Sequence, residues 1–166
     1  ASDVYKRQDG ITPNAIGTIS GAAGGPKWLA LSQLDRAIFG KWLPPDRQKP
    51  LFLVGSSIGT WRFSAVTQKN PVAAIQTFEE AYFSQKYSSK PTPKEVTEEG
   101  RRILDIYLKD EAIVSLLNHP YYRLHVIAVA CKHLFKSESK AALIAGMGIA
   151  GSTNAIHPKF LKAHFE

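Results

Sequence analysis

Short apolar runs alternate along this chain with longer segments in which apolar residues recur every three or four positions. Apolar runs of strand length cover residues 15–20, 51–55 and 122–134. Helix-like spacing covers residues 27–40, 58–68, 71–87, 94–120, 141–156 and 158–166. This alternation predicts an α/β fold, in which a mainly parallel sheet lies between two layers of helices in a three-layer α/β/α arrangement.

Several predicted helix boundaries coincide with residues that begin or end helices. Pro26 and Pro71 stand at helix starts, where a missing amide hydrogen costs no bond, and Gly40 ends the first helix. The helix over residues 94–120 is expected in two pieces that meet near Lys109. The apolar face expected for the first helix consists of Trp28, Leu31, either Leu34 or Asp35, and Ile38.

A serine between two glycines follows the second apolar run, which has the continuous apolar character of a parallel strand covered on both faces. Residues 55–59 read Gly-Ser-Ser-Ile-Gly, with a predicted strand before them and a predicted helix after them. This G-x-S-x-G pattern is typical of a nucleophile elbow, a sharp turn that presents a serine hydroxyl above the sheet. Ser57 is therefore a candidate nucleophile, and Gly55 and Gly59 would relieve steric collisions in the turn. The alternative is that Ser57 only caps the following helix.

A second turn rich in small residues, Gly-Ala-Ala-Gly-Gly-Pro-Lys at residues 21–27, follows the first predicted strand. A phosphate-binding Walker loop requires adjacent Gly and Lys and then Ser or Thr, and the dinucleotide pattern G-x-G-x-x-G is also absent. Backbone amides exposed at a helix start can instead stabilise an oxyanion. The alternative is that the loop is only a turn that allows tight packing. Because ligands of parallel sheets gather at the carboxyl ends of strands, we expect this loop and Ser57 to belong to one site.

Together, residues 15–40 and 51–82 resemble the patatin-like phospholipase family. The resemblance implies that Ser57 is the nucleophile and that Gly21, Ala22 and Ala23 form the oxyanion hole, with Gly24 as a further candidate. In that family, an aspartate in an Asp-Gly-Gly or Asp-Gly-Ala turn completes a Ser–Asp dyad. No such turn follows Ser57 here, so we expect the aspartate beyond residue 166 and expect residues 1–166 alone to be inactive. The family also carries Arg or Lys at the position of Gly25.

The resemblance implies a serine acyl hydrolase that cleaves phospholipid or acylglycerol esters without a cofactor. A different class of function stays open: a non-catalytic binding or scaffold protein that keeps the fold with a decayed site, an alternative that Gly25 supports. We expect the partners to be a lipid or small ester, with contact to a membrane surface as an option. A cytoplasmic or membrane-peripheral location is favoured.

Composition and charge narrow these alternatives only slightly. The net charge is +7, but the basic residues are scattered, so nucleic acid is not expected as a partner. The single cysteine, Cys131, lies in an apolar run and is expected to be a buried thiol. No metal site is expected from the spacing of histidines and carboxylates.

Other residues that could take part in catalysis are weaker candidates. The five histidines all follow Ser57, as a Ser-His-Asp hydrolase requires, but none stands in a turn that would hold it over the sheet: His119, His125, His133, His157 and His164. Asp105 and Asp110 are expected to be solvated, and Arg62 is expected at the surface.

The first eight residues resemble the translated end of a transposon used to fragment DNA for sequencing, and so are excluded from the fold. Residues 9–166 are expected to form a single, incomplete hydrolase domain that is truncated at its C-terminal side.

Overall fold

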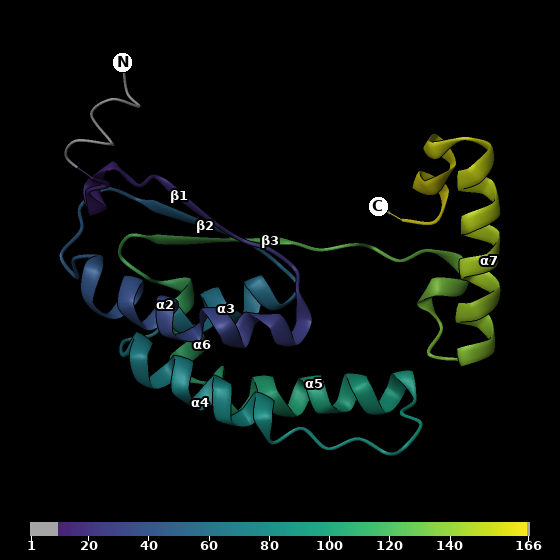
Figure 1. The fold of residues 1–166 in the computed structure, drawn as a ribbon, viewed down its shortest axis with the longest axis horizontal. Helices are drawn as coiled ribbons and strands as arrows, with labels where there is room; N and C mark the ends of the chain where they lie inside the picture. Colours follow the sequence, from purple (N-terminus) through teal and green to yellow (C-terminus); the bar gives the residue numbers. More distant parts are fainter. Residues whose placement is uncertain (1–9, 166) are drawn as a thin grey trace. The chain divides into compact units, whose positions relative to one another are not determined.

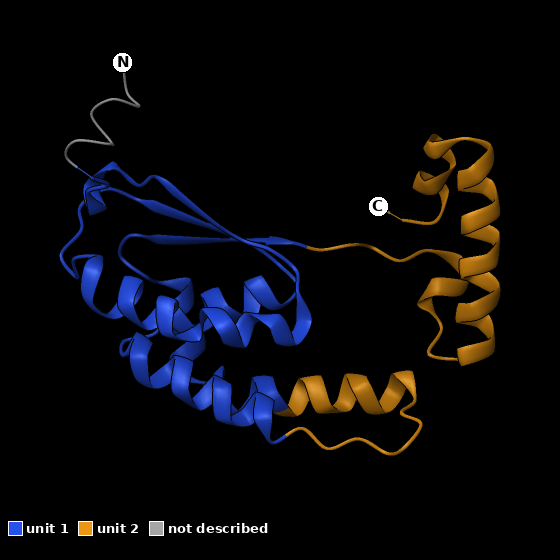
Figure 2. Cartoon of the chain, viewed as in Figure 1, with its two compact units in different colours: residues 1–84, 103–127 blue, residues 85–102, 128–166 orange. Residues whose placement is uncertain are grey.

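The structure, a computed structural model, describes residues 10–165, so the proposed transposon-derived segment lies outside the described residues. The chain divides into two compact units, shown in different colours in Figure 2. The first contains residues 1–84 and 103–127, and the second contains residues 85–102 and 128–166. Each unit is described by itself.

A parallel three-stranded sheet forms the first unit, in the order β1-β2-β3. Its strands are β1 (Thr18–Gly21), β2 (Leu51–Ser56) and β3 (Tyr122–Ile127). The predicted parallel sheet is thus confirmed, although β1 begins three residues later than expected and β3 ends seven residues earlier. In the register, Gly21 pairs with Gly55, and Gly55 with Val126, so all three strands end at one edge.

The helical segments of the first unit lie on one side of this sheet (Figure 1). Their bounds are η2 (Gly25–Leu31), α2 (Ser32–Ala37), η3 (Ile38–Trp42), α3 (Ile58–Val66), α4 (Pro71–Phe83) and α6 (Glu111–Leu117). Helix α5 (Pro93–Tyr107) contributes its last turn to the same unit. The expected break near Lys109 is confirmed, because α5 ends and α6 begins on either side of it.

The opposite face of the sheet is open within the described part of this unit. Leu51 and Leu53 are fully buried, whereas Phe52 between them is 42% exposed. Thr18, Ser20 and His125 on the neighbouring strands are also exposed. The expectation that β2 is covered on both faces is therefore wrong for the described part of the first unit, which by itself forms two layers, one of strands and one of helices. A continuous apolar run does not by itself distinguish a strand with one buried face from a strand with two.

The core between the helices and the sheet is built around Phe78 of α4, which is completely buried. Its ring stacks on Trp28 with 4.3 Å between centroids and lies 4.6 Å from the ring of Tyr107. The Tyr107 hydroxyl shares a hydrogen bond of 3.0 Å with Ser64 of α3, and burial raises the pKa of this hydroxyl well above its ordinary value. Helices α3, α4 and α5 are thus joined by one cluster of aromatic rings.

The buried face of the segment from Gly25 to Trp42 agrees only in part with the face that the sequence predicts. Leu31 and Leu34 are 40% and 52% exposed, and the segment changes from 3-10 to α to π geometry along its length. Trp28 and Asp35 belong to the predicted face and are buried, so this part of the prediction is confirmed. Ser32 and Phe39 complete the buried stripe at the same three- and four-residue spacing, each one residue beyond the predicted Leu31 and Ile38. The buried residues are Trp28, Ser32, Asp35 and Phe39.

The loop before β2 carries a buried arginine that fixes the start of β1. The Arg47 guanidinium donates hydrogen bonds to the carbonyls of Pro13 at 2.7 Å, Lys49 at 2.8 Å, and Ile16. Only 5% of Arg47 is exposed. Arg47 therefore ties the segment preceding β1 to the segment preceding β2.

The second unit contains η4 (His133–Lys136), α7 (Lys140–Ile156) and η5 (Pro158–Ala163), with η4 and η5 both packed on α7. Cys131 pairs with Phe165 in a single antiparallel bridge, and its side chain is exposed. The expectation of a buried thiol is therefore wrong: β3 ends four residues before Cys131, so this residue lies outside the sheet. None of the helices in the described part of the chain combines the length and apolar composition that a membrane span requires.

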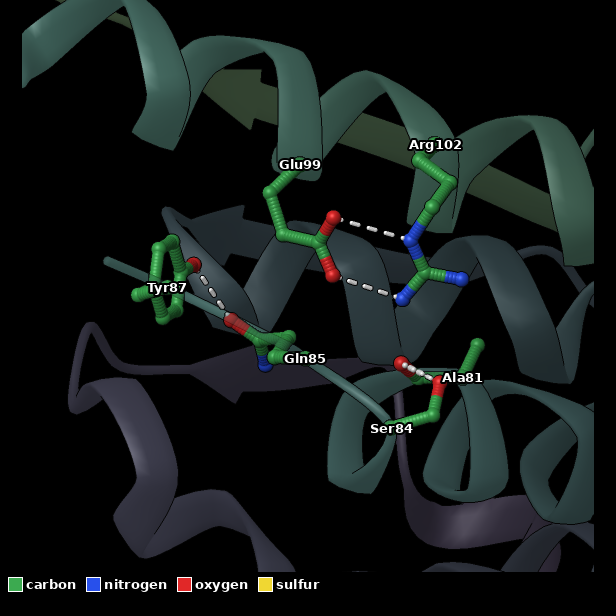
Figure 3. A network of polar contacts seen from close by, with 6 residues as sticks. All are labelled: Ala81, Ser84, Gln85, Tyr87, Glu99 and Arg102. Carbon is green, nitrogen blue, oxygen red and sulfur yellow. Dashed lines mark hydrogen bonds and ion pairs between the residues drawn. The ribbon is translucent and has the colours of Figure 1, made fainter. Parts of the chain in front are cut away.

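The chain that leads from α4 into α5 is held by short-range polar contacts (Figure 3). The Arg102 guanidinium donates to both Glu99 oxygens at 2.9 and 2.7 Å, and these bonds lower the pKa of the Glu99 carboxyl. Ser84 donates to the Ala81 carbonyl at 2.9 Å at the end of α4. Salt bridges of this exposed kind contribute little to stability, so they mainly order the local chain.

His119 stands just before β3 in a setting that disfavours its protonation. Its Nδ1 accepts a hydrogen bond of 2.9 Å from the Tyr122 amide, and its ring stacks on the Tyr122 ring. Burial, with a contribution from the charge of Arg123, lowers the pKa of His119 from 6.5 to about 4. Protonation of Nδ1 would remove the acceptor that holds the start of β3.

We predict that His119 makes the protein less stable in acid. Because its folded pKa is depressed, its contribution to the free energy of unfolding is complete above about pH 6.5 and decreases as pH falls toward 4. Asn keeps a hydrogen-bond acceptor but does not titrate. Replacing His119 with Asn should therefore make the urea midpoint less dependent on pH between pH 7 and pH 4.5. His125→Asn, a change of an exposed histidine on β3, is the control. An unchanged pH slope in His119→Asn would contradict the prediction.

Candidate active site

Ser57 forms the entire connection between β2, which ends at Ser56, and α3, which begins at Ile58. Its backbone has φ 52° and ψ −126°, a conformation that residues with a Cβ rarely adopt. Such conformations persist only where the surrounding structure enforces them, and they concentrate at functional sites. The Ser57 side chain is exposed to solvent. The turn therefore has the strained geometry and the accessible hydroxyl that a nucleophile elbow requires.

The two glycines of the pattern are required by close backbone packing. A Cβ added at Gly55 would lie 2.5 Å from the Cα of Thr60, in the first turn of α3. A Cβ added at Gly59 would lie 2.1 Å from the carbonyl oxygen of Gly21, at the end of β1. Both distances are far shorter than van der Waals contact, so no larger residue fits without movement of the backbone.

The alternative in which Ser57 serves as a helix cap is wrong. Ser57 occupies the N-cap position of α3, but its side chain makes no capping hydrogen bond. Within residues 10–165, the Ser57 hydroxyl has no hydrogen-bond partner at all. The hydroxyl is thus free to meet a ligand.

The loop after β1 lies beside this turn, because Gly21 and Gly55 are partners in the register of neighbouring strands. Gly21 is buried under Phe63 and Gly59, whereas Ala22 and Ala23 are exposed. Within the described chain, the amides of Ala22 and Ala23 donate no hydrogen bond. The structure thus brings together the predicted oxyanion residues and the predicted nucleophile at one edge of the sheet.

Gly25 adopts φ +51°, a left-handed conformation that disfavours any residue with a side chain. This is the position at which the patatin-like pattern has Arg or Lys. The loop therefore has a local backbone conformation suited to glycine rather than to a basic residue. Lys27, two residues later, is exposed and lies in η2.

Arg62 of α3 was expected at the surface, and this expectation is wrong. Its Nε and Nη2 atoms donate to the two oxygens of Asp35 on α2 at 2.7 and 2.6 Å. Only 9% of Arg62 and 3% of Asp35 is exposed. The signal in the sequence was the charged Asp35 on the face predicted to be apolar, because a buried carboxylate requires a partner.

None of the other candidate groups in the described part of the first unit forms a hydrogen bond with Ser57. Asp105 and Asp110 are exposed, as expected. His125 pairs in register with Val54, and its ring lies 5.6 Å from that of Phe52 on the open face of the sheet. His119 precedes the start of β3, at the edge opposite Ser57. Among the described residues, no histidine or carboxylate contacts the Ser57 hydroxyl.

Comparison of the chain with models of protein families, with curated proteins and with solved structures finds no match. A functional interpretation therefore depends on the geometry of the turn at Ser57 and of the loop beside it. The resemblance to patatin-like phospholipases stays a hypothesis that this geometry can support.

We predict that Gly59→Ala strongly destabilises the first unit. The added methyl group would meet the Gly21 carbonyl, and the displacement of backbone should cost about 3 kcal/mol or more in the free energy of unfolding. Gly151→Ala in α7 is the matched control, because its Cβ would meet nothing within 4 Å and should raise helix stability by up to about 1 kcal/mol. Urea denaturation of both variants tests the prediction, and equal stability of the Gly59 variant and the wild type would refute it.

Proposed function

We propose that this chain is part of a serine acyl hydrolase of the patatin-like type, in which Ser57 is the nucleophile. The observation that carries the proposal is the strained, exposed turn at Ser57, with unbonded amides of Ala22 and Ala23 on the adjoining loop. Within the described chain the Ser57 hydroxyl makes no hydrogen bond, so the fold has no structural use for the side chain that this strained position carries.

In the proposed reaction, Oγ of Ser57 bonds to the carbonyl carbon of an ester while the hydroxyl proton passes to a carboxylate base. The carbon–oxygen bond to the alcohol then breaks, and the alcohol leaves with that proton. Water attacks the resulting acyl-serine, releases the fatty acid and regenerates the Ser57 hydroxyl. Among the described residues, no carboxylate contacts the Ser57 hydroxyl. We therefore propose that the base is an aspartate outside residues 1–166.

The developing negative charge would be stabilised by the amides of the loop at residues 21–23. Donors of this kind lie in fixed backbone, so they need no reorganisation when the oxyanion forms, and each lowers the barrier by about 3 to 4 kcal/mol. The N-terminus of α3, directly after Ser57, adds its positive dipole end at the same place. The substrate class, phospholipid or acylglycerol esters, follows from the family resemblance, and the net charge of +7 suits an anionic lipid surface.

A non-catalytic binding protein is the second candidate, and Gly25 favours it. The basic residue of the family pattern is replaced there by a glycine with φ +51°. If the base is also missing from the complete protein, the turn and the loop would contact a ligand without turning it over.

We predict that Ser57→Ala abolishes hydrolysis of a short-chain nitrophenyl ester by the protein encoded by the reading frame extended beyond Glu166. The expected loss in kcat is at least about 1000-fold, because the covalent step then has no nucleophile. Ser56→Ala, the adjacent serine at the end of β2, is the matched control and should keep most of the activity. Undiminished turnover in Ser57→Ala would eliminate the nucleophile assignment, and a wild type without turnover would favour the binding protein.

A further inference from the structure

The Asp35–Arg62 ion pair connects the two helical segments that continue from the two loops of the proposed site. Asp35 stands on α2, which follows the loop at residues 21–24 through the uninterrupted helical segment that starts at Gly25. Arg62 stands on α3, five residues after Ser57. A displacement of α2 relative to α3 therefore moves the oxyanion loop relative to the nucleophile.

The geometry of this pair is more restrictive than that of a surface ion pair. Both Asp35 oxygens are bound, at 2.6 and 2.7 Å, by two different nitrogens of Arg62, so the planes of the two groups are aligned. Both side chains are almost fully removed from solvent. Water therefore does not compete for these hydrogen bonds, and a change in the separation of the helices would break both of them.

A second contact between the same segments lies at the site itself. The carbonyl of Gly21 meets the backbone of Gly59, one turn of α3 before Arg62. The backbone contact limits how closely α3 and the end of β1 approach, while the ion pair limits how far α2 and α3 separate. These two contacts fix the distance between the loop and the Ser57 turn from both sides.

We propose that Asp35 and Arg62 are positioning residues. Their ion pair holds the oxyanion loop at residues 21–24 at a fixed position relative to Ser57. The catalytic part of this inference rests on the proposed function, whereas the positional part does not. Neither residue touches the reacting atoms in this role.

The chain offers a matched control on the same helix. Arg36, the neighbour of Asp35, forms an ion pair with Glu79 of α4, and Ser32 donates to the same Glu79 at 3.0 Å. This second pair attaches α2 to α4, and none of its hydrogen bonds within the described chain involves a residue of α3. It should stabilise the fold without setting the position of the loop relative to Ser57.

The test compares Arg62→Lys with Arg36→Lys in the protein encoded by the complete reading frame. Lysine keeps the charge but loses the two-pronged geometry of the guanidinium. Hydrogen exchange of peptides that cover residues 27–37, the helical segment that continues from the loop, and residues 55–60 should accelerate about tenfold in Arg62→Lys and stay within about twofold of wild type in Arg36→Lys. Steady-state kinetics should show kcat reduced by about 100-fold in Arg62→Lys with KM nearly unchanged, and kcat retained in Arg36→Lys.

The exchange measurement decides the proposal independently of activity. Equal exchange in the two variants, or exchange in Arg62→Lys that matches wild type, would overturn it. If Arg62→Lys does not fold, Asp35→Glu, which keeps the carboxylate one methylene further out, replaces it with the same expectations. Absence of turnover in the wild type, or full turnover in Ser57→Ala, would contradict the proposed function only. The hydrogen-exchange measurement would still confirm or overturn the positioning role.

Discussion

The contact between the Gly21 carbonyl and the backbone of Gly59 is the constraint on which the arrangement of the first unit depends. It allows α3 to begin directly above the end of β1, with no space for a side chain between them. Because α3 starts so close to the sheet, the connection from β2 has room for a single residue, and that residue must adopt the strained conformation found at Ser57. The same approach places the loop after β1 at the edge of the sheet where the Ser57 turn lies. One steric contact thus produces the turn, the exposure of the serine and the proximity of the loop.

The polar interactions of the helix layer have a different purpose from its aromatic core. The rings around Phe78 supply the buried apolar surface that stabilises the unit, and they tolerate small displacements of the helices. The ion pairs of Asp35 with Arg62 and of Arg36 with Glu79 are directional, so they select one placement of α2 among those that the apolar contacts would allow. Arg47 does the same for the segment before β1 through three carbonyl oxygens. Apolar packing stabilises this fold, and buried guanidinium groups specify it.

The sequence was sufficient to predict features that depend on local pattern. The parallel sheet, the division of the helix near Lys109 and the juxtaposition of residues 21–23 with Ser57 follow from periodicity and from the rule that parallel strands end at one edge. Features that depend on which side chains meet across the fold were not predictable in this way. Arg62 is predicted at the surface because the sequence does not reveal its partner on α2. Cys131 is predicted to be buried because the sequence does not reveal that β3 ends at Ile127. The open face behind Phe52 was missed for a related reason, since a run of apolar residues does not reveal what covers each face.

The positive φ of Ser57 also has an evolutionary consequence. A glycine at this position would adopt the same backbone without the steric cost, which for a residue with a Cβ is of the order of 1 to 3 kcal/mol. A mutation from serine to glycine at this position would therefore make the fold more stable. Selection for the hydroxyl would oppose that change. In a lineage that no longer needed the chemistry, position 57 should be among the first to change, and the fold would become more stable as it did. Retention of serine at this position in related chains would therefore be a sign of selection for its hydroxyl, independent of any pattern match.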